Sequence, residues 1–134
     1  FTELHRLEVT NAFGLLLGRG LLTEAEHGAV LAQLQDDVTA RRLNAVAPDW
    51  ADVFRSAGDL SGRHTPRVLT RSLDVLHVAL AKVLACRTFV SADDRQLALA
   101  RLAGLRAIDI KPKRKAKRVR PISVRRPRGP GRDS

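Results

Sequence analysis

The first forty residues place apolar side chains every three or four positions, which is the spacing of one face of an α-helix. This pattern predicts a first helix over residues 4–16 that ends at Gly18. A capping box formed by Thr23 and Glu26 predicts the start of a second helix. The apolar face of this second helix consists of Val30, Leu31, Leu34 and Val38.

The middle of the chain alternates between short apolar runs and residues that break regular structure. Residues 43–47 are largely apolar and precede a proline, which predicts a strand. An aspartate then offers a cap for a third helix, expected over residues 50–60. Residues 61–70 contain Gly62 and Pro66, so we expect them to form a loop.

Residues 72–85 form the most apolar helical pattern in the chain, with apolar side chains in nearly every direction around the axis. We therefore expect this helix to be central and buried. A strand over residues 88–92, a helix over 94–103 and a second strand over 105–110 follow it. Strand, helix and strand at this spacing predict a parallel βαβ unit with a right-handed crossover, so the expected class is α/β.

Residues 111–134 lack this periodicity and hold the whole charge excess of the protein, whose formal net charge is +10. Residues 1–110 carry 13 Lys and Arg against 13 Asp and Glu, whereas residues 111–134 carry 11 Lys and Arg against a single Asp. A segment this basic, interrupted by Pro and Gly, cannot bury enough apolar surface to fold alone. We predict one domain over residues 1–110, followed by a disordered basic tail.

Cysteine content and hydropathy indicate the cellular setting. Cys86 is the single cysteine, so no internal disulfide can form, and a reducing cytoplasm fits this composition best. No apolar run is long enough to span a bilayer, which predicts a soluble protein without a membrane partner. The sequence has no methionine and begins with Phe1, so we interpret it as a fragment of a longer polypeptide.

Three carboxylates occupy positions where a carboxylate is unusual. Glu8 lies on the helix face that should meet the core, and Asp74 lies in the first turn of the most apolar helix. Both also have ordinary explanations. Glu8 can be a boundary residue whose carboxylate reaches water, and the negative charge of Asp74 can be stabilised by the helix dipole at the N-terminus of its helix. Asp93 follows a strand and can cap the next helix in a capping box with Gln96. The end of a parallel strand is also where open α/β sheets bind ligands.

Together the three acids predict a site for a hard divalent cation. Mg²⁺ and Mn²⁺ prefer oxygen ligands, and such ions assist phosphodiester cleavage by activating water and neutralising charge. The sequence lacks the parts of competing chemistries, since it has neither a Cys/His cluster for zinc nor a Gly-rich phosphate loop. Cys86 ends an apolar helix and is interpreted as a small core residue.

Three segments of the sequence resemble, in order and spacing, the PIN domains, and among these the VapC-type toxins of bacterial toxin–antitoxin pairs. The segments are LHRLEVTNA (residues 4–12), TRSLDVLHVALA (70–81) and FVSADDRQLALARLAGLRAIDI (89–110). The resemblance implies a PIN-like parallel sheet with flanking helices and a metal-dependent endoribonuclease activity. It also implies RNA as the substrate, a cognate antitoxin as an inhibiting partner, and a homodimer.

The resemblance assigns roles residue by residue. The family's acidic positions fall on Glu8, Asp74 and Asp93, which are then expected to bind Mg²⁺ or Mn²⁺. Ser91 matches a hydroxyl position that often supports the site. His77 matches a frequent histidine of the toxin subgroup, although a structural role is the commoner one for a core histidine.

Two features depart from the family pattern. PIN domains open with a strand that ends in an aspartate, and nothing before Glu8 supplies it, so we expect an N-terminally truncated domain. The basic tail lies beyond the resemblance and is either an RNA-binding extension or a segment without a selected role. The alternative function is therefore a non-catalytic nucleic-acid-binding module on an incomplete PIN scaffold. The candidate tail contacts are Lys113, Arg114, Lys115, Lys117 and Arg118.

Overall fold

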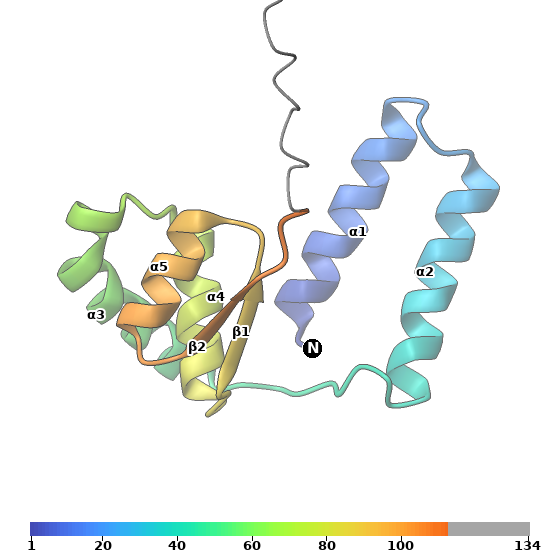
Figure 1. The fold of residues 1–134 in the computed structure, drawn as a ribbon. Coiled ribbons are helices and arrows are strands. Elements are labelled where there is room, and N and C mark those ends of the chain that lie inside the picture. Colours follow the sequence, from blue (N-terminus) through green and yellow to red (C-terminus); the bar gives the residue numbers. More distant parts are fainter. Residues whose placement is uncertain (113–134) are drawn as a thin grey trace, which may run out of the picture.

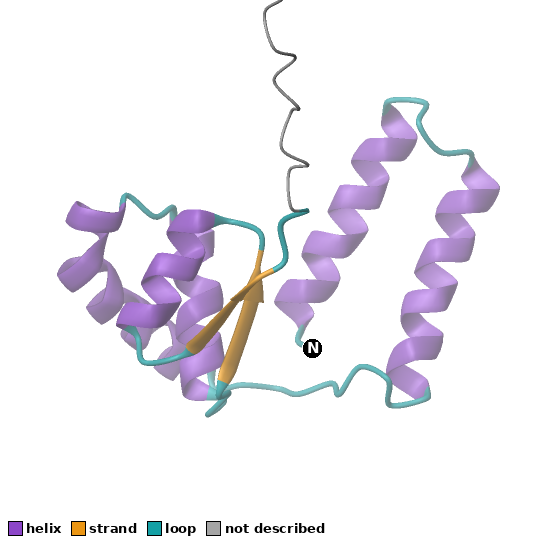
Figure 2. Ribbon diagram, in the orientation of Figure 1, coloured by secondary structure: helices purple, strands orange, loops and turns teal. Residues whose placement is uncertain are grey.

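The computed structural model describes residues 1–112, which form five helices and a two-stranded sheet (Figures 1 and 2). The elements in chain order are α1 (Glu3–Gly18), α2 (Glu24–Thr39), α3 (Trp50–Val68), α4 (Ser72–Val83), β1 (Thr88–Ser91), α5 (Asp94–Leu102) and β2 (Arg106–Asp109). Among residues 1–112, no helix is both long and apolar enough to cross a membrane. The disordered tail was predicted over residues 111–134; its residues 113–134, which include the five candidate contacts, lie outside the described residues.

Residues 88–109 form a parallel βαβ unit, as predicted. β1 and β2 pair in parallel, with Thr88 opposite Arg106 and Ser91 opposite Asp109. Helix α5 connects the two strands and packs against both of them (Figure 1). Side chains alternate between the faces of a strand, so Phe89 and Ser91 face the helices. The described chain is thus a mixed α/β arrangement with a small parallel sheet.

Helices α3, α4 and α5 and the sheet form the packed body of the protein. The most extensive helix contact is between α3 and α4, and α5 closes the core between them and the sheet. Helix α4 is central and buried, which confirms the prediction from its apolar pattern. The buried core cluster consists of Val53, Ala57, Leu60, Val75, Leu76, Val78, Ala79, Leu80, Leu99 and Ala100. The interpretation of Cys86 as a small core residue is wrong, because Cys86 lies after the end of α4 and is exposed.

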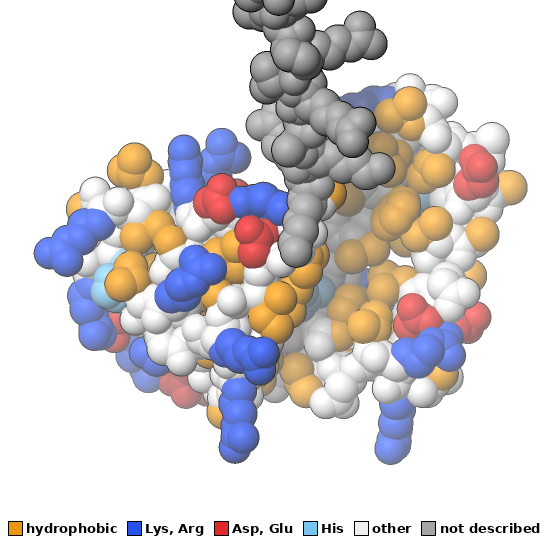
Figure 3. All heavy atoms as spheres, viewed as in Figure 1, with side chains coloured by type: hydrophobic (Ala, Val, Ile, Leu, Met, Phe, Trp, Pro, Cys, Tyr) orange, Lys and Arg blue, Asp and Glu red, His pale blue; other side chains and the backbone are white. Residues whose placement is uncertain are grey.

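The α1–α2 hairpin stands beside this body (Figure 1). Neither helix contains a buried residue, and Leu7 and Leu15 are 66% and 51% exposed. From α1, Leu4 packs against the core of the body. Figure 3 shows apolar side chains on the hairpin and along the sheet, bordering the hollow between them.

The strand predicted over residues 43–47 is wrong, because this segment forms an irregular connection between α2 and α3. Its backbone binds the N-terminus of the chain rather than a strand of the sheet. The N–H of Val46 donates to the carbonyl of Phe1 at 2.9 Å, and the ammonium group of Phe1 donates to the carbonyl of Asn44 at 2.9 Å. Two isolated hydrogen bonds of this kind do not make a ladder.

The loop predicted over residues 61–70 is also wrong, because α3 continues to Val68. The inward positions keep their helical spacing from Leu60 to His64 and Val68, while Gly62 and Pro66 fall on exposed positions. Pro66 lies in the last turn of the helix, where few following residues depend on its geometry. The helix ends instead at Leu69, whose φ of 58° is left-handed.

Candidate functional site

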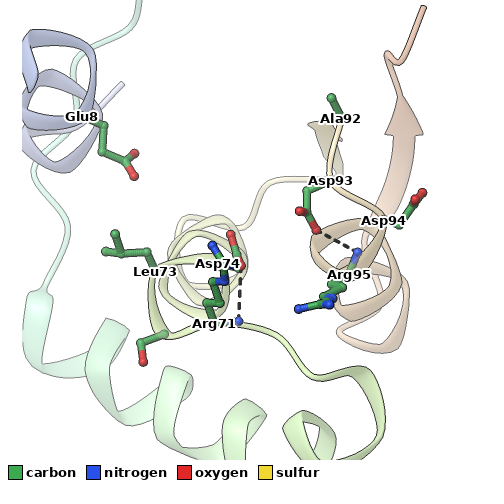
Figure 4. A pocket seen from close by; sticks show the side chains of 9 residues that line it. Glu8, Arg71, Leu73, Asp74, Ala92, Asp93, Asp94 and Arg95 are labelled. Carbon is green, nitrogen blue, oxygen red and sulfur yellow. Dashed lines mark hydrogen bonds between the residues drawn. The ribbon is translucent and has the colours of Figure 1, made fainter. Parts of the chain in front are cut away.

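A pocket of about 750 Å³ opens at the C-terminal end of β1, where three separate parts of the chain meet (Figure 4). Helix α1 contributes Glu8, the start of α4 contributes Asp74, and the turn between β1 and α5 contributes Asp93. The structure therefore brings the three predicted acids to one pocket. The lining residues are Glu8, Arg71, Ser72, Leu73, Asp74, Ala92, Asp93, Asp94 and Arg95.

Asp93 is the N-cap of α5. Its Oδ1 accepts hydrogen bonds from the backbone N–H groups of Arg95 at 2.8 Å and Gln96 at 2.9 Å. The bond from Gln96 is the main cause that holds the pKa of Asp93 below its usual range, and the charges of Arg95 and Lys111 act in the same direction. The carboxylate of Asp93 is therefore ionised at neutral pH.

The side chain of Gln96 connects the two aspartates to the end of β1. Its Oε1 accepts from the hydroxyl of Ser91 at 2.6 Å, and its Nε2 donates to Oδ1 of Asp74 at 3.5 Å. The buried Ser91 hydroxyl oxygen also accepts from the backbone N–H of Asp93 at 3.0 Å. The predicted capping box of Asp93 and Gln96 is thus only half formed, because Ser91 takes the N–H that Gln96 would have bound.

Asp74 is half-buried in the first turn of α4 and is hydrogen-bonded, as its apolar surroundings require. Its Oδ2 accepts from the backbone N–H of Arg71 at 3.3 Å. The bond from Gln96 to its other oxygen is also long. Neither bond is strong, so both oxygens of Asp74 can accept further interactions from the pocket.

Glu8 is oriented across the gap between α1 and α4 by His77. Its Oε2 lies 2.7 Å from Nε2 of His77, and the Glu8 side chain remains 39% exposed. The ring of His5 lies against that of His77, with centroids 5.3 Å apart. Burial, and then the nearby His77, lower the pKa of His5, whose Nδ1 accepts from the N–H of Thr2 at 3.1 Å. Glu8 is thus partly exposed, as a boundary residue is, and is also held by a partner on α4.

Asp94 points away from the other acids (Figure 4). Its side chain is 82% exposed and forms an ion pair with Lys111. The hydrogen bond to Asp94 is the main cause that raises the pKa of Lys111. Asp94 is therefore directed outward and is less suited than Asp93 to bind a ligand in the pocket.

The three predicted ligands share a pocket but do not form a compact metal-binding cluster. Within residues 1–112, no group of three or more His, Cys, Asp and Glu side chains is placed so that it could hold a metal ion. The donors fit Mg²⁺ or Mn²⁺ in kind, because all three are carboxylates. Their positions do not yet fit, since Glu8 stands on one side of the pocket and Asp93 on the other (Figure 4).

Two cationic side chains that were not predicted from the sequence, Arg71 and Arg95, line the same pocket. Arg95 is positioned by a hydrogen bond of 3.3 Å from its Nη1 to the carbonyl of Leu69. A sequence signal for both was present, since Arg71 lies three residues before Asp74 and Arg95 lies two residues after Asp93. Both therefore flank acids at the starts of helices, where the pocket forms.

Comparison with known proteins does not identify a relative. No protein-family model, no curated protein and no solved structure matches the chain. The function is therefore inferred from the residues of this pocket and from the resemblance of the three sequence segments.

Proposed function

We propose that this protein is a metal-dependent endoribonuclease of the VapC-type PIN class, which hydrolyses RNA with Mg²⁺ or Mn²⁺. The observation that carries the proposal is the meeting of Glu8, Asp74 and Asp93 at one pocket at the end of a parallel strand. The same three acids stand, in order, at the acidic positions of the family pattern. An inhibiting antitoxin and a second copy of the chain are proposed partners on the strength of that resemblance.

The polar groups of the pocket suit a phosphodiester substrate. A divalent cation, if held in this pocket, would activate water and neutralise phosphate charge. The ionised Asp93 and the half-buried Asp74 are the carboxylates that would hold it, and Gln96 and Ser91 link them through hydrogen bonds. Arg71 and Arg95 border the same space, and guanidinium groups bind phosphate oxygens through paired hydrogen bonds.

The described chain departs from a complete site in two ways. Glu8 must share or release His77 before it can reach a cation held by the two aspartates. Residues 1–7 form the cap and first turns of α1, so they do not supply the family's additional aspartate, which lies on a strand before the glutamate. We therefore expect cation binding through Asp74 and Asp93 to be weak in the described chain.

Binding of Mn²⁺, followed by the loss of the free-ion signal in electron paramagnetic resonance, tests the cation site directly. Asp74→Asn and Asp93→Asn should each weaken binding by about tenfold or more, because each removes a charged ligand. Asp94→Asn is the matched control, since Asp94 also lines the pocket but points away from it, and it should bind Mn²⁺ like the parent protein. Equal losses in all three variants would contradict a defined site.

Cleavage of a fluorogenic single-stranded RNA tests the reaction. The proposal expects hydrolysis that requires added Mg²⁺ or Mn²⁺, is abolished by chelation, and is lost in Asp74→Ala. Cleavage that survives chelation, or that Asp74→Ala leaves intact, would contradict the proposal. A protein extended at its N-terminus by a strand ending in aspartate should cleave faster, and no cleavage by that protein would also contradict it.

A non-catalytic nucleic-acid-binding module is the second candidate, favoured by the concentration of positive charge after residue 110. It predicts RNA binding that weakens steeply with salt, because phosphate contacts release counterions. Replacing Lys113, Arg114, Lys115, Lys117 and Arg118 by Gln should flatten the salt dependence, by roughly 0.7 in log–log slope for each lost contact to a single strand. An unchanged slope would exclude these residues as the binding surface.

A further inference from the structure

A groove of about 460 Å³ lies between α3 and α4 and adjoins the acidic pocket that Glu8, Asp74 and Asp93 line. The start of α4 forms the border between the two cavities, because Ser72 and Leu73 line both of them. Figure 4 shows Leu73 next to Asp74 at the edge of the acidic pocket. The volume of the groove lies in the range of roughly 300–1,000 Å³ that is usual for small-ligand sites. A ligand that passes Leu73 can therefore occupy both cavities.

The groove and the acidic pocket differ in their chemistry. Four acids and two arginines line the acidic pocket, whereas none of the described residues that line the groove carries a charge. The polar side chains of the groove are the hydroxyls of Ser61 and Ser72. A hydroxyl both donates and accepts, so each can bind the polar edge of an uncharged ligand. The groove therefore suits an uncharged group and the acidic pocket a charged one.

An exposed aromatic ring and an open space lie next to each other in this groove. Phe54 is 61% exposed, although it is the largest apolar side chain that lines the groove. Gly58 follows it by four residues in α3 and is therefore its neighbour on the same helix face. A Cβ atom added at Gly58 would meet no other atom within 4 Å. The space over Gly58 thus leaves room for a flat group beside the ring of Phe54.

We propose that this groove binds a nucleobase of the RNA strand whose phosphate lies in the acidic pocket, an inference that rests on the proposed function. A nucleotide joins an anionic phosphate to a flat, uncharged base, which is the combination that the two adjoining cavities accept. Exposed aromatic side chains stack on any base, because every base has a π-face. A base inside a duplex is stacked and paired and cannot enter the groove, so the substrate is single-stranded beside the cleaved bond.

A nucleobase suits the groove better than another protein does, because the exposed apolar surface of the groove is small. Phe54 and Leu73 are its only exposed apolar side chains, at 61% and 53%, whereas Ala57, Val75 and Leu76 are buried. A stable protein–protein interface buries about 800 Å² on each partner. Two exposed side chains supply only a small part of that area, but they are enough for one face of a single base.

The test compares two strands that differ only in their bases. One is a short single-stranded oligoadenosine RNA and the other is the same sugar–phosphate strand without bases, so any contact of the basic residues 111–134 with phosphates is common to both. The full-length protein should bind the first strand roughly fivefold to a hundredfold more tightly, measured by the anisotropy of a fluorescent label on the RNA. Trp50 is the single tryptophan, and its ring lies 6.3 Å from that of Phe54, so only the first strand should quench its emission.

Binding is measured with a chelator present, so it needs neither a bound cation nor cleavage. Base-dependent binding by a protein that shows no metal-dependent cleavage would contradict the proposed function alone. Metal-dependent cleavage without base-dependent binding would contradict this inference alone.

Two pairs of variants locate the base. Phe54→Leu keeps an apolar side chain but removes the ring, and it should abolish the difference in affinity between the strands, whereas Phe54→Tyr should retain it. Gly58→Leu fills the groove and should also abolish the difference. Gly62→Leu is its matched control, because Gly62 lies in the same helix and has equal room for a Cβ, but does not line the groove. Leucine favours a helix more than glycine does, so neither glycine variant should unfold at a lower temperature than the parent protein.

Four results would overturn the inference. The first is equal affinity of the parent protein for the two strands, and the second is a difference that survives in both Phe54→Leu and Gly58→Leu. The third is a loss in Gly62→Leu as large as that in Gly58→Leu. The fourth is a dimer in sedimentation that Gly58→Leu dissociates and Gly62→Leu does not, which would show that a second copy of the chain fills the groove.

Discussion

The α1–α2 hairpin and the body of the protein differ in how their helices are stabilised. Within residues 1–112, all eleven buried apolar residues lie between Val53 and Ala100, in the body, whereas neither α1 nor α2 contains a buried residue. Helix α2 depends instead on its cap, in which the N–H of Glu26 donates to the hydroxyl of Thr23 at 3.2 Å and Glu26 accepts from the N–H of Thr23 at 2.8 Å. Regular spacing and a good cap thus specify a helix without providing a core, and tertiary packing stabilises only the helices of the body.

The candidate site contains residues from both of these regions. Asp74 and Asp93 belong to the body and are joined by Gln96, whereas Glu8 belongs to the hairpin. The hairpin meets the body through few contacts, chiefly the pairing of Glu8 with His77, the contact of His5 with His77, and the packing of Leu4. The geometry of the site therefore depends on how firmly the hairpin docks.

The largest expected effect compares one leucine from each region. Leu99 is fully buried in the body, and Leu99→Ala should lower the free energy of unfolding by roughly 2–5 kcal/mol. Leu15 in the hairpin is 51% exposed, and Leu15→Ala should change the free energy of unfolding by about 0.5 kcal/mol or less. Urea unfolding followed by circular dichroism measures both. Similar losses in the two variants would show that the hairpin has a core of its own.

The next effect concerns the helix caps of the two regions. Asp93→Ala removes the cap of α5 and should cost about 1 kcal/mol in global unfolding, whereas Asp93→Asn keeps a capping oxygen and should cost much less. Thr23→Ala removes the cap of α2, and its effect should appear as faster amide exchange in α2 while global unfolding hardly changes. A global loss from Thr23→Ala equal to that from Asp93→Ala would contradict the separation of the two regions.

A smaller effect is expected where the regions meet. Glu8→Gln weakens the pairing with His77, and a partly exposed ion pair contributes only about 0–1 kcal/mol. Amide exchange should become faster in α1 and stay unchanged in β1 and α5. Glu3→Gln is the matched control, because the ion pair of Glu3 with Arg6 lies within α1. Faster exchange in α1 from both variants alike would mean that Glu8 does not dock the hairpin.

The smallest effect is a pH dependence of this docking. The pKa of His5 is lowered in the folded protein, chiefly by burial. As the pH falls below the ordinary histidine pKa of about 6.5, His5 therefore binds a proton more readily in the unfolded chain than in the folded protein. Docking is therefore fully stabilised above that pH and is weakened as the pH falls through the folded pKa. Exchange in α1, corrected for its intrinsic pH dependence, should be faster at about pH 5.5 than at about pH 7.5. The difference should disappear in His5→Gln, and its persistence there would assign the effect to another group.

The sequence predicted the elements whose local pattern and tertiary role agree. Helix α4 was predicted correctly because its apolar pattern matches its buried place in the fold. The βαβ unit was predicted correctly because it follows from the spacing of its elements alone. The segment over residues 43–47 was misassigned because its apolar residues have no strand within reach, which no local pattern reveals. Gly62 and Pro66 suggested a break in α3, but the inward positions keep their spacing past Gly62, and Pro66 lies in the last turn, two residues before the helix ends.

The candidate site was predictable in its membership and not in its geometry. Glu8, Asp74 and Asp93 were identified because each is a charge at a position with a specific structural meaning, and all three line the pocket. The side chain of Glu8 is turned towards His77 because of the way α1 docks against α4. This docking is a property of the whole fold and cannot be read from the local sequence. The roles of Arg71 and Arg95 also depend on two helix starts coming together in space.

The hydrogen bonds behind the aspartates have a common direction. The N–H of Asp93 donates to Ser91, the hydroxyl of Ser91 donates to Gln96, and the amide of Gln96 donates to Asp74. The residue between Ser91 and Asp74 in this series of hydrogen bonds must have both an acceptor and a donor at the end of its side chain. Glutamate has nearly the same shape as glutamine and differs from it by one base in a codon, yet it would set two carboxylates against each other. We expect evolution to retain glutamine at position 96 for as long as it retains an acid at position 74.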